Sequence, residues 1–172
     1  ILGSLAPFAT LGMYVLWMRL RPRPVRVFLS YRVASDSDVA QALYEQLTKA
    51  GIDVWWDKMC LPKGKKWEEG FVDGLLSSTF FVAILSKPAL ESFGTLNATS
   101  SCDNVLLEHR LALELHARKR IRRIFPVFVG AREEQGSFLG DALPRSVLPH
   151  CPEGIIVGAV ETKVAEYMRR RW

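Results

Sequence analysis

Short apolar runs of strand length recur along the sequence between stretches of helical periodicity, and this alternation limits the folds open to the chain. The clearest runs are VRVFLS at 25–30 and TFFVAILS at 79–86. Continuous apolar runs of this length, rich in β-branched and aromatic residues, are typical of strands buried on both faces of a sheet. Strands that alternate with helices favour a parallel sheet covered by helices on both sides, with the second of these runs at its centre.

Three further runs complete the predicted sheet. IDVWW at 52–56 is predicted as the second strand, RIFPVFV at 123–129 as the fourth and GIIVGAV at 154–160 as the fifth. Pro126 has no backbone N–H to give to a neighbour, which places the fourth strand near an edge. The sequence therefore predicts one α/β domain with a five-stranded parallel sheet, over residues 25–172.

Helices are predicted where apolar residues recur at helical spacing. Residues 35–38 offer caps for a first helix that ends at Gly51, and Asp103 and Asn104 offer caps for a later one. The helices after the first are expected at 67–76, 105–118 and 161–171, with loops rich in turn-forming residues at 57–66 and 88–101.

Ligands of parallel α/β sheets bind beyond the carboxyl ends of the strands. The candidate site is therefore formed by the loops that follow Ser30, Trp56, Ser86 and Val129. Side chains alternate along a strand, so Trp55 and Trp56 are expected on opposite faces of the sheet.

The first 18 residues contain no charge and lead into RLRPRP at 19–24. Roughly 18 to 20 apolar residues cross a bilayer, and arginines just after an apolar span mark its cytoplasmic side. We therefore expect a transmembrane segment at 1–18, a stiff Arg/Pro linker, and a membrane-anchored domain in the cytoplasm. A buried helix or the end of an upstream domain is the alternative, because Pro7 and Gly12 weaken a helix.

Most enzyme signatures are absent, including GxGxxG, GxxxxGK[ST], GxSxG and HExxH. The three cysteines and three histidines have no metal-ligand spacing, so neither a metal site nor a disulfide framework is predicted. The net charge of +5 is concentrated near 19–26, 118–123 and 169–171. Such clusters bind nucleic acid or anionic lipid, or are solvated surface; solvated surface is the simpler interpretation, and we expect no nucleic-acid partner.

Four segments in order resemble the TIR (Toll/interleukin-1 receptor) family. FLSYR at 28–32 is similar to the family's first box, and GIDVWWD at 51–57 with the following LPKG is similar to its second strand and BB loop. TFFVAILS is similar to the third strand, and SSCDNVLLEHRLALEL at 100–115 is similar to the third-helix segment. The resemblance covers roughly residues 25–170 and implies a flavodoxin-like fold.

The family contains enzymes that cleave nicotinamide from NAD⁺ and adaptors that only assemble. The resemblance places Glu108 where the enzymes carry a glutamate that contacts the nicotinamide-bearing ribose. Loss of nicotinamide leaves an oxocarbenium-like ribose, whose charge a carboxylate stabilises. The alternatives are a surface ion pair with Arg110 and, because Asn104 stands where the enzymes commonly have tryptophan, a shifted alignment that selects Glu114.

The resemblance also assigns residues to the nucleotide site. Tyr31 and Arg32 would meet the adenine ring and the pyrophosphate, since a guanidinium pairs with two phosphate oxygens at once. The alternative for Arg32 is a plain surface cation. Trp55 would stack on a base, or be part of the core. Ser30 would bond the ribose, and Asp57 would hold the loop entrance or simply make a turn.

The predicted BB loop consists of Lys63, Gly64, Lys65, Lys66 and Trp67. In the family this loop packs against a neighbouring TIR domain and gates the pocket; ordinary loop charges are the alternative. The resemblance thus implies homotypic assembly, with NAD⁺ as substrate and no bound cofactor. Two functions follow: an NAD⁺ nucleosidase of innate-immune or stress signalling that self-association activates, or a non-catalytic signalling adaptor.

Overall fold

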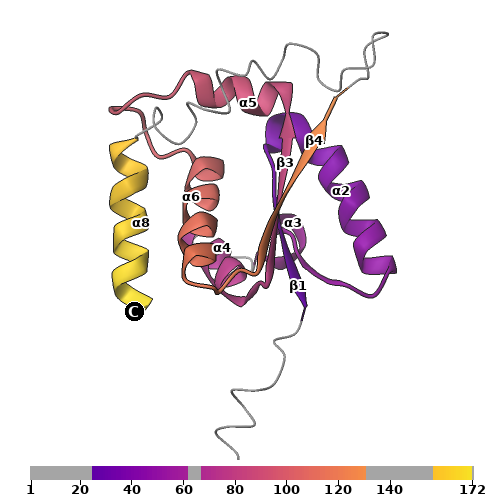
Figure 1. Cartoon of the computed structure of the whole chain (residues 1–172). Helices are drawn as coiled ribbons and strands as arrows, with labels where there is room; N and C mark the ends of the chain where they lie inside the picture. The colour runs from indigo at the N-terminus through magenta and orange to yellow at the C-terminus, as the bar shows by residue number, and fades with distance from the viewer. Residues whose placement is uncertain (1–24, 62–66, 131–156, 172) are drawn as a thin grey trace, which may run out of the picture.

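The computed structural model describes residues 25–61, 67–130 and 157–171, which form a parallel sheet flanked by helices (Figure 1). The strands of these residues are β1 (Arg26–Ser30), β2 (Asp53–Trp55), β3 (Phe80–Ser86) and β4 (Arg123–Val129), in the order β2-β1-β3-β4. The helices are α2 (Val33–Lys49), α3 (Asp57–Cys60), α4 (Trp67–Ser77), α5 (Lys87–Gly94), α6 (Asn104–Ala117) and α8 (Gly158–Arg171). This arrangement confirms the predicted α/β class, with β1 and β3 as inner strands.

Each face of the sheet has its own hydrophobic core. Phe28, Trp55 and Phe81 lie on the face covered by α4, α6 and α8, whereas α2 covers the other face (Figure 1). Trp56 belongs to the second core, where its ring lies 4.9 Å from that of Tyr44 on α2. The two tryptophans therefore point to opposite faces, as strand alternation predicts.

The predicted fifth strand is wrong over its last three residues, 158–160, which form the first turn of α8. Residues 154–156 lie outside the described part of the chain. Val157, Val160 and Val164 are all buried in the first core. Valines spaced three and four residues apart lie on one face of a helix. In a short apolar run, a helix and a strand cannot be told apart from the sequence pattern alone.

The predicted loop at 88–101 is also wrong over its first half, which is α5. Ser86 caps this helix by accepting a hydrogen bond from the Ala89 backbone N–H at 3.2 Å, and Pro88 occupies its first turn, where no N–H is needed. The short helix α3 likewise interrupts the loop predicted at 57–66. The helix α2 begins at Val33, earlier than the caps predicted at 35–38. Its N-cap is Arg32, whose side chain makes no capping hydrogen bond.

Several predictions fall on parts that the structure does not describe. The expected transmembrane segment at 1–18, the linker at 19–24 and the loop residues from Lys63 to Lys66 lie outside the described residues, and Trp67 is the first residue of α4. Among the described residues, no helix is both long enough and apolar enough to cross a bilayer.

Candidate functional site

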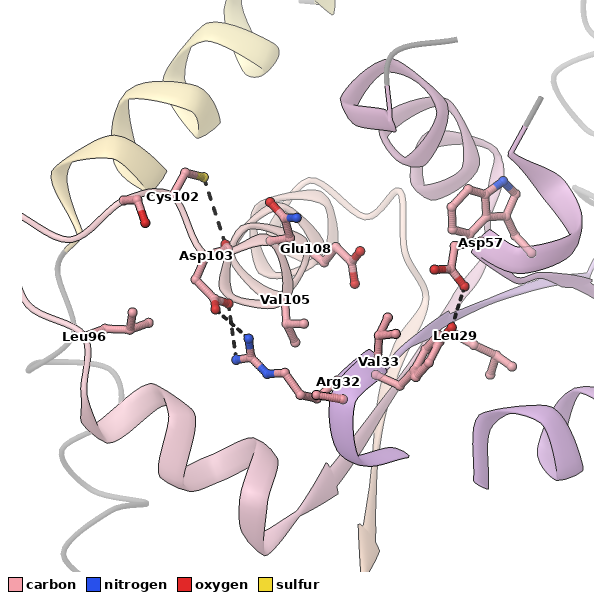
Figure 2. Close-up of a pocket in the computed structure, with 14 residues that line it drawn as sticks. Leu29, Arg32, Val33, Asp57, Leu96, Cys102, Asp103, Val105 and Glu108 are labelled. Atoms are coloured by element: carbon pink, nitrogen blue, oxygen red, sulfur yellow. Dashed lines mark hydrogen bonds and ion pairs between the residues drawn. The ribbon is translucent and has the colours of Figure 1, made fainter. Parts of the chain in front are cut away.

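A cavity of about 420 Å³ lies beyond the carboxyl ends of β1 and β2, bordered by α2, α3 and the start of α6 (Figure 2). Pockets that bind small molecules have volumes of roughly 300 to 1,000 Å³. The lining residues are Leu29, Tyr31, Arg32, Val33, Ala34, Trp55, Asp57, Leu96, Ser101, Cys102, Asp103, Asn104, Val105 and Glu108. The cavity therefore occupies the position where ligands bind in parallel α/β sheets.

Glu108 projects from the second turn of α6 and points toward the Asp57 side of the cavity (Figure 2). Its Oε2 accepts a hydrogen bond of 2.6 Å from the hydroxyl of Ser30, which is fully buried at the end of β1. This hydrogen bond joins two residues that are 78 positions apart in the sequence. Glu108 does not form the alternative ion pair with Arg110. Arg110 instead binds Glu161 of α8, at 2.9 Å.

Burial raises the pKa of Glu108 from 4.5 to about 8. The hydrogen bond from Ser30 opposes this rise, the charges of Asp57 and Asp103 add to it, and the charge of Arg32 opposes it. The carboxyl group is therefore largely protonated at neutral pH. A positive charge placed in the cavity would lower this pKa and favour the carboxylate.

His109, next to Glu108 on α6, adds no positive charge to the site. Its ring packs edge-on against Phe81 and Phe93, with centroids 5.5 and 5.7 Å apart. Burial lowers the pKa of His109 to about 4, so the imidazole is neutral at physiological pH.

A hydrogen bond joins Tyr31, which follows β1, to Asp57, which follows β2. The Tyr31 hydroxyl donates a hydrogen bond of 2.8 Å to Oδ1 of Asp57, which also accepts from the backbone N–H of Lys58. Burial, followed by the hydrogen bond and the negative charge of Asp57, raises the pKa of Tyr31 well above its usual value. Asp57 thus begins α3 and orients a phenol on the cavity wall.

Arg32 forms an ion pair with Asp103, in which Nη1 and Nη2 lie 2.6 and 3.3 Å from the two carboxylate oxygens. Both side chains are mostly buried, at 18% and 14% exposure, and the guanidinium lies 5.2 Å from the centre of the Phe93 ring. Asp103 also caps α6 by accepting from the backbone N–H of Leu106, as the sequence predicts. One carboxylate therefore ties α6 to the end of β1.

Replacing Asp103 by asparagine separates these two roles. Asparagine still caps a helix but cannot form the ion pair, so we expect Asp103→Asn to lower the free energy of unfolding by about 2 kcal/mol. Asp103→Ala should lose about 1 kcal/mol more, because it also removes the cap. Urea denaturation of the three proteins measures both steps, and equal stabilities for Asp103→Asn and wild type would contradict the role of the pair.

Trp55 reaches the cavity, but its ring is already packed against neighbouring residues. Its ring stacks on Phe28, with centroids 4.5 Å apart and planes 6° apart. On Gly74 of α4, an added Cβ would lie 2.2 Å from the indole ring. The stacking role of Trp55 on a base would require this packing to change.

Gly74→Ala should destabilise the fold by about 1–3 kcal/mol, because the new methyl group overlaps a packed ring. Gly94→Ala is the matched control at the end of α5, since an added Cβ there meets no atom within 4 Å. We expect that control to be neutral or stabilised by less than about 1 kcal/mol. Thermal unfolding compares the two, and similar melting temperatures would show that α4 moves away without cost.

The structure brings together Tyr31, Arg32, Trp55, Asp57 and Glu108 in one cavity, with Ser30 directly behind Glu108. Glu114, the alternative to Glu108, does not line it and pairs with Arg118 instead. Sequence reasoning missed Asp103 as a partner of Arg32, because it recognised only the capping role. It also missed Leu96, which carried no signal beyond lying in the predicted loop at 88–101, and Cys102, which lies between that loop and the predicted helix.

The comparisons agree with this geometry. The profile of the TIR domain family matches residues 27–147. Among solved structures, the chain is similar to the TIR domains in the structure of the activated Roq1 resistosome directly recognizing the pathogen effector XopQ, with a TM-score of 0.51 and 19% identity over 83% of this chain and 82% of that one. This likeness shows a shared fold, and no curated protein matches the sequence significantly. Because the family match spans more than half of its length, the chain belongs to the TIR domain family.

Proposed function

We propose that this TIR domain is an NAD⁺ nucleosidase that cleaves NAD⁺ to nicotinamide and ADP-ribose. The observation that carries the proposal is the position of Glu108, whose carboxyl group is buried, bonded to Ser30 and aimed into a cavity at the strand ends. A buried carboxyl group with a strongly shifted pKa in a pocket is characteristic of functional sites.

In the proposed reaction the bond between C1′ of the ribose and the pyridinium nitrogen breaks, and its electron pair goes to the ring. Nicotinamide leaves as a neutral molecule, and the ribose becomes oxocarbenium-like. The Glu108 carboxylate would stabilise that positive charge through hydrogen bonds to the ribose hydroxyls. Water then adds to C1′ and releases a proton, which gives ADP-ribose.

The charge of the nicotinamide ring suits this site. The nicotinamide ring of NAD⁺ is cationic, and the described cavity lining carries three carboxyl groups, on Asp57, Asp103 and Glu108, against one guanidinium. The entering cation would favour ionisation of Glu108 and so would help to generate the reactive form. Ser30 would hold that carboxylate in place.

The second candidate function is a non-catalytic adaptor that acts through TIR–TIR contacts. Two observations favour it: Arg32 is already paired with Asp103, and Phe28 and α4 pack against the ring of Trp55. Neither residue is then available to the nucleotide without rearrangement. Self-association that reshapes the cavity would reconcile both functions, and the likeness to TIR domains of a resistosome supports assembly and an innate-immune role. We also propose a membrane-anchored location, with the domain in the cytoplasm, on the strength of residues 1–18.

The test is nicotinamide release by the full chain at increasing protein concentration, in solution and on phospholipid vesicles. We expect nicotinamide and ADP-ribose in equal amounts, with a rate per molecule that rises with concentration. Self-association without any nicotinamide release would contradict the nucleosidase and leave the adaptor.

The pH dependence of kcat/KM gives a separate prediction, because this parameter reports pKa values of the free enzyme. Glu108 is reactive as a carboxylate and has a pKa of about 8. We therefore expect kcat/KM to rise about tenfold per pH unit below pH 8 and to level off above it. A profile that is flat between pH 6 and 8, at constant ionic strength, would contradict a protonated Glu108 in the free enzyme.

A further inference from the structure

Six basic side chains lie at the end of the domain where the strands begin, opposite the end that holds the cavity. We call this surface the basic rim. It consists of Arg26, Arg118, Lys119, Arg122, Arg123 and Arg169.

The parallel topology gathers these residues from three distant parts of the sequence. The backbone N–H of Thr79 donates a hydrogen bond of 2.8 Å to the carbonyl of Arg26, and the N–H of Arg122 donates one of 2.8 Å to the carbonyl of Thr79. Arg26 and Arg122 therefore lie on either side of Thr79. The helices α6 and α8 run side by side in the same direction, since Arg110 in the middle of α6 bonds Glu161 in the first turn of α8, and Leu115 and Met168 near their ends line one small cavity. Figure 1 shows the ends of both helices and the starts of β1 and β4 on the same side of the domain.

Most of the positive charge on the rim is not neutralised. Arg26 pairs with Asp53 at 2.6 Å, and Arg118 pairs with Glu114 at 2.9 Å. Among the described residues, no ion pair involves the four others, which are exposed: Lys119, Arg122, Arg123 and Arg169. Four exposed charges of one sign on one surface create a local positive potential.

One of these cations occupies a conformation that lysine rarely adopts. Lys119 has φ of 58°, just after the end of α6, where glycine is the favoured residue. The backbone conformation at this position favours glycine, but the residue there is a lysine with an exposed side chain.

We propose that the basic rim binds the anionic surface of a phospholipid bilayer. The sequence indicates this partner, because β1 begins at the rim and the chain reaches it from the uncharged residues 1–18 through 19–24, which hold three more arginines. Basic residues next to an apolar segment bind anionic headgroups, and each increases partitioning roughly fivefold.

This orientation leaves the cavity accessible. The seven residues of β3 separate the rim from the cavity end of the sheet by roughly 20 Å. Screening limits the field of a lipid surface to about 8 Å at physiological ionic strength. Membrane contact through the rim therefore leaves the site facing away from the lipid, and the proposal does not depend on NAD⁺ cleavage.

The test is flotation of the full chain with vesicles of phosphatidylcholine alone and of phosphatidylcholine with phosphatidylserine. Because residues 1–18 can hold the chain on both vesicles, the readout is the ratio of the two partition coefficients, with hydrogen exchange at 118–123 as a local measure. The double variant Arg122→Glu/Arg123→Glu removes two cations from the rim. Lys58→Glu/Lys87→Glu makes the same charge change on α3 and α5, which follow the other ends of β2 and β3.

We expect phosphatidylserine to raise partitioning of the wild type and to slow exchange at 118–123. The rim variant should lower the ratio by at least roughly 25-fold, and the control variant should keep it. Matching thermal unfolding of the two variants shows that both are folded. Equal binding to both vesicles, equal ratios for the two variants, or tighter binding of single-stranded RNA than of the phosphatidylserine vesicles would each overturn the proposal.

Discussion

Replacing Glu108 by glutamine should slow nicotinamide release from NAD⁺ by about 100- to 1,000-fold, the usual effect of removing one group that stabilises developing charge. Glutamine has nearly the same shape and can still accept the hydrogen bond from Ser30. It cannot carry the negative charge that an oxocarbenium-like ribose requires. The loss should therefore appear in kcat more than in KM, because the substrate pocket keeps its form.

Glu114→Gln is the matched control for this experiment. Glu114 lies on the same helix, but it is 40% exposed, pairs with Arg118 and does not line the cavity. We expect its rate of nicotinamide release to equal that of the wild type within about twofold, since an exposed pair contributes little. Equal losses in both variants would show that α6 as a whole, and not the buried carboxyl group, controls the rate.

The parts of the fold that the sequence predicted are those with one strong local signal. The 79–86 and 123–129 runs are strands as expected, and α6 begins within one residue of its prediction because Asp103 caps it. The helix α5 was missed because proline, serine and glycine suggested a loop. Those residues suit a capped helix start equally well, and only the packing of Ala89 and Phe93 in the folded chain decides between the two.

The candidate site was predictable in its location and less so in its contacts. Strand ends and the family resemblance selected Ser30, Arg32 and Glu108, which do lie together. The pairing of Arg32 with Asp103 joins residues 71 positions apart and has no local signal. The depth at which Glu108 is buried depends on every element around it, so its shifted pKa could not be read from the sequence either.

The same Glu108→Gln substitution should make the protein more stable at neutral pH. The pKa of Glu108 is about 8 in the folded protein, against 4.5 for a glutamate exposed to solvent. Below pH 4.5 the group is protonated in both states and has no effect on the balance. As the pH rises from 4.5 to 8, the unfolded chain loses this proton while the folded protein keeps it, so the wild type loses stability across that window.

At pH 7 this difference corresponds to about 3 kcal/mol that glutamine, which does not ionise, avoids. Urea denaturation should therefore show Glu108→Gln more stable than the wild type at pH 7 and nearly equal to it at pH 4. Glu114→Gln should differ from the wild type by less than about 0.5 kcal/mol at both pH values. Equal stability of Glu108→Gln and the wild type at pH 7 would show that Glu108 is already ionised in the folded protein and that its contacts offset the cost of burying the charge. A substitution that abolishes activity and yet stabilises the fold indicates a residue kept for chemistry, because a structural residue would lose stability when replaced.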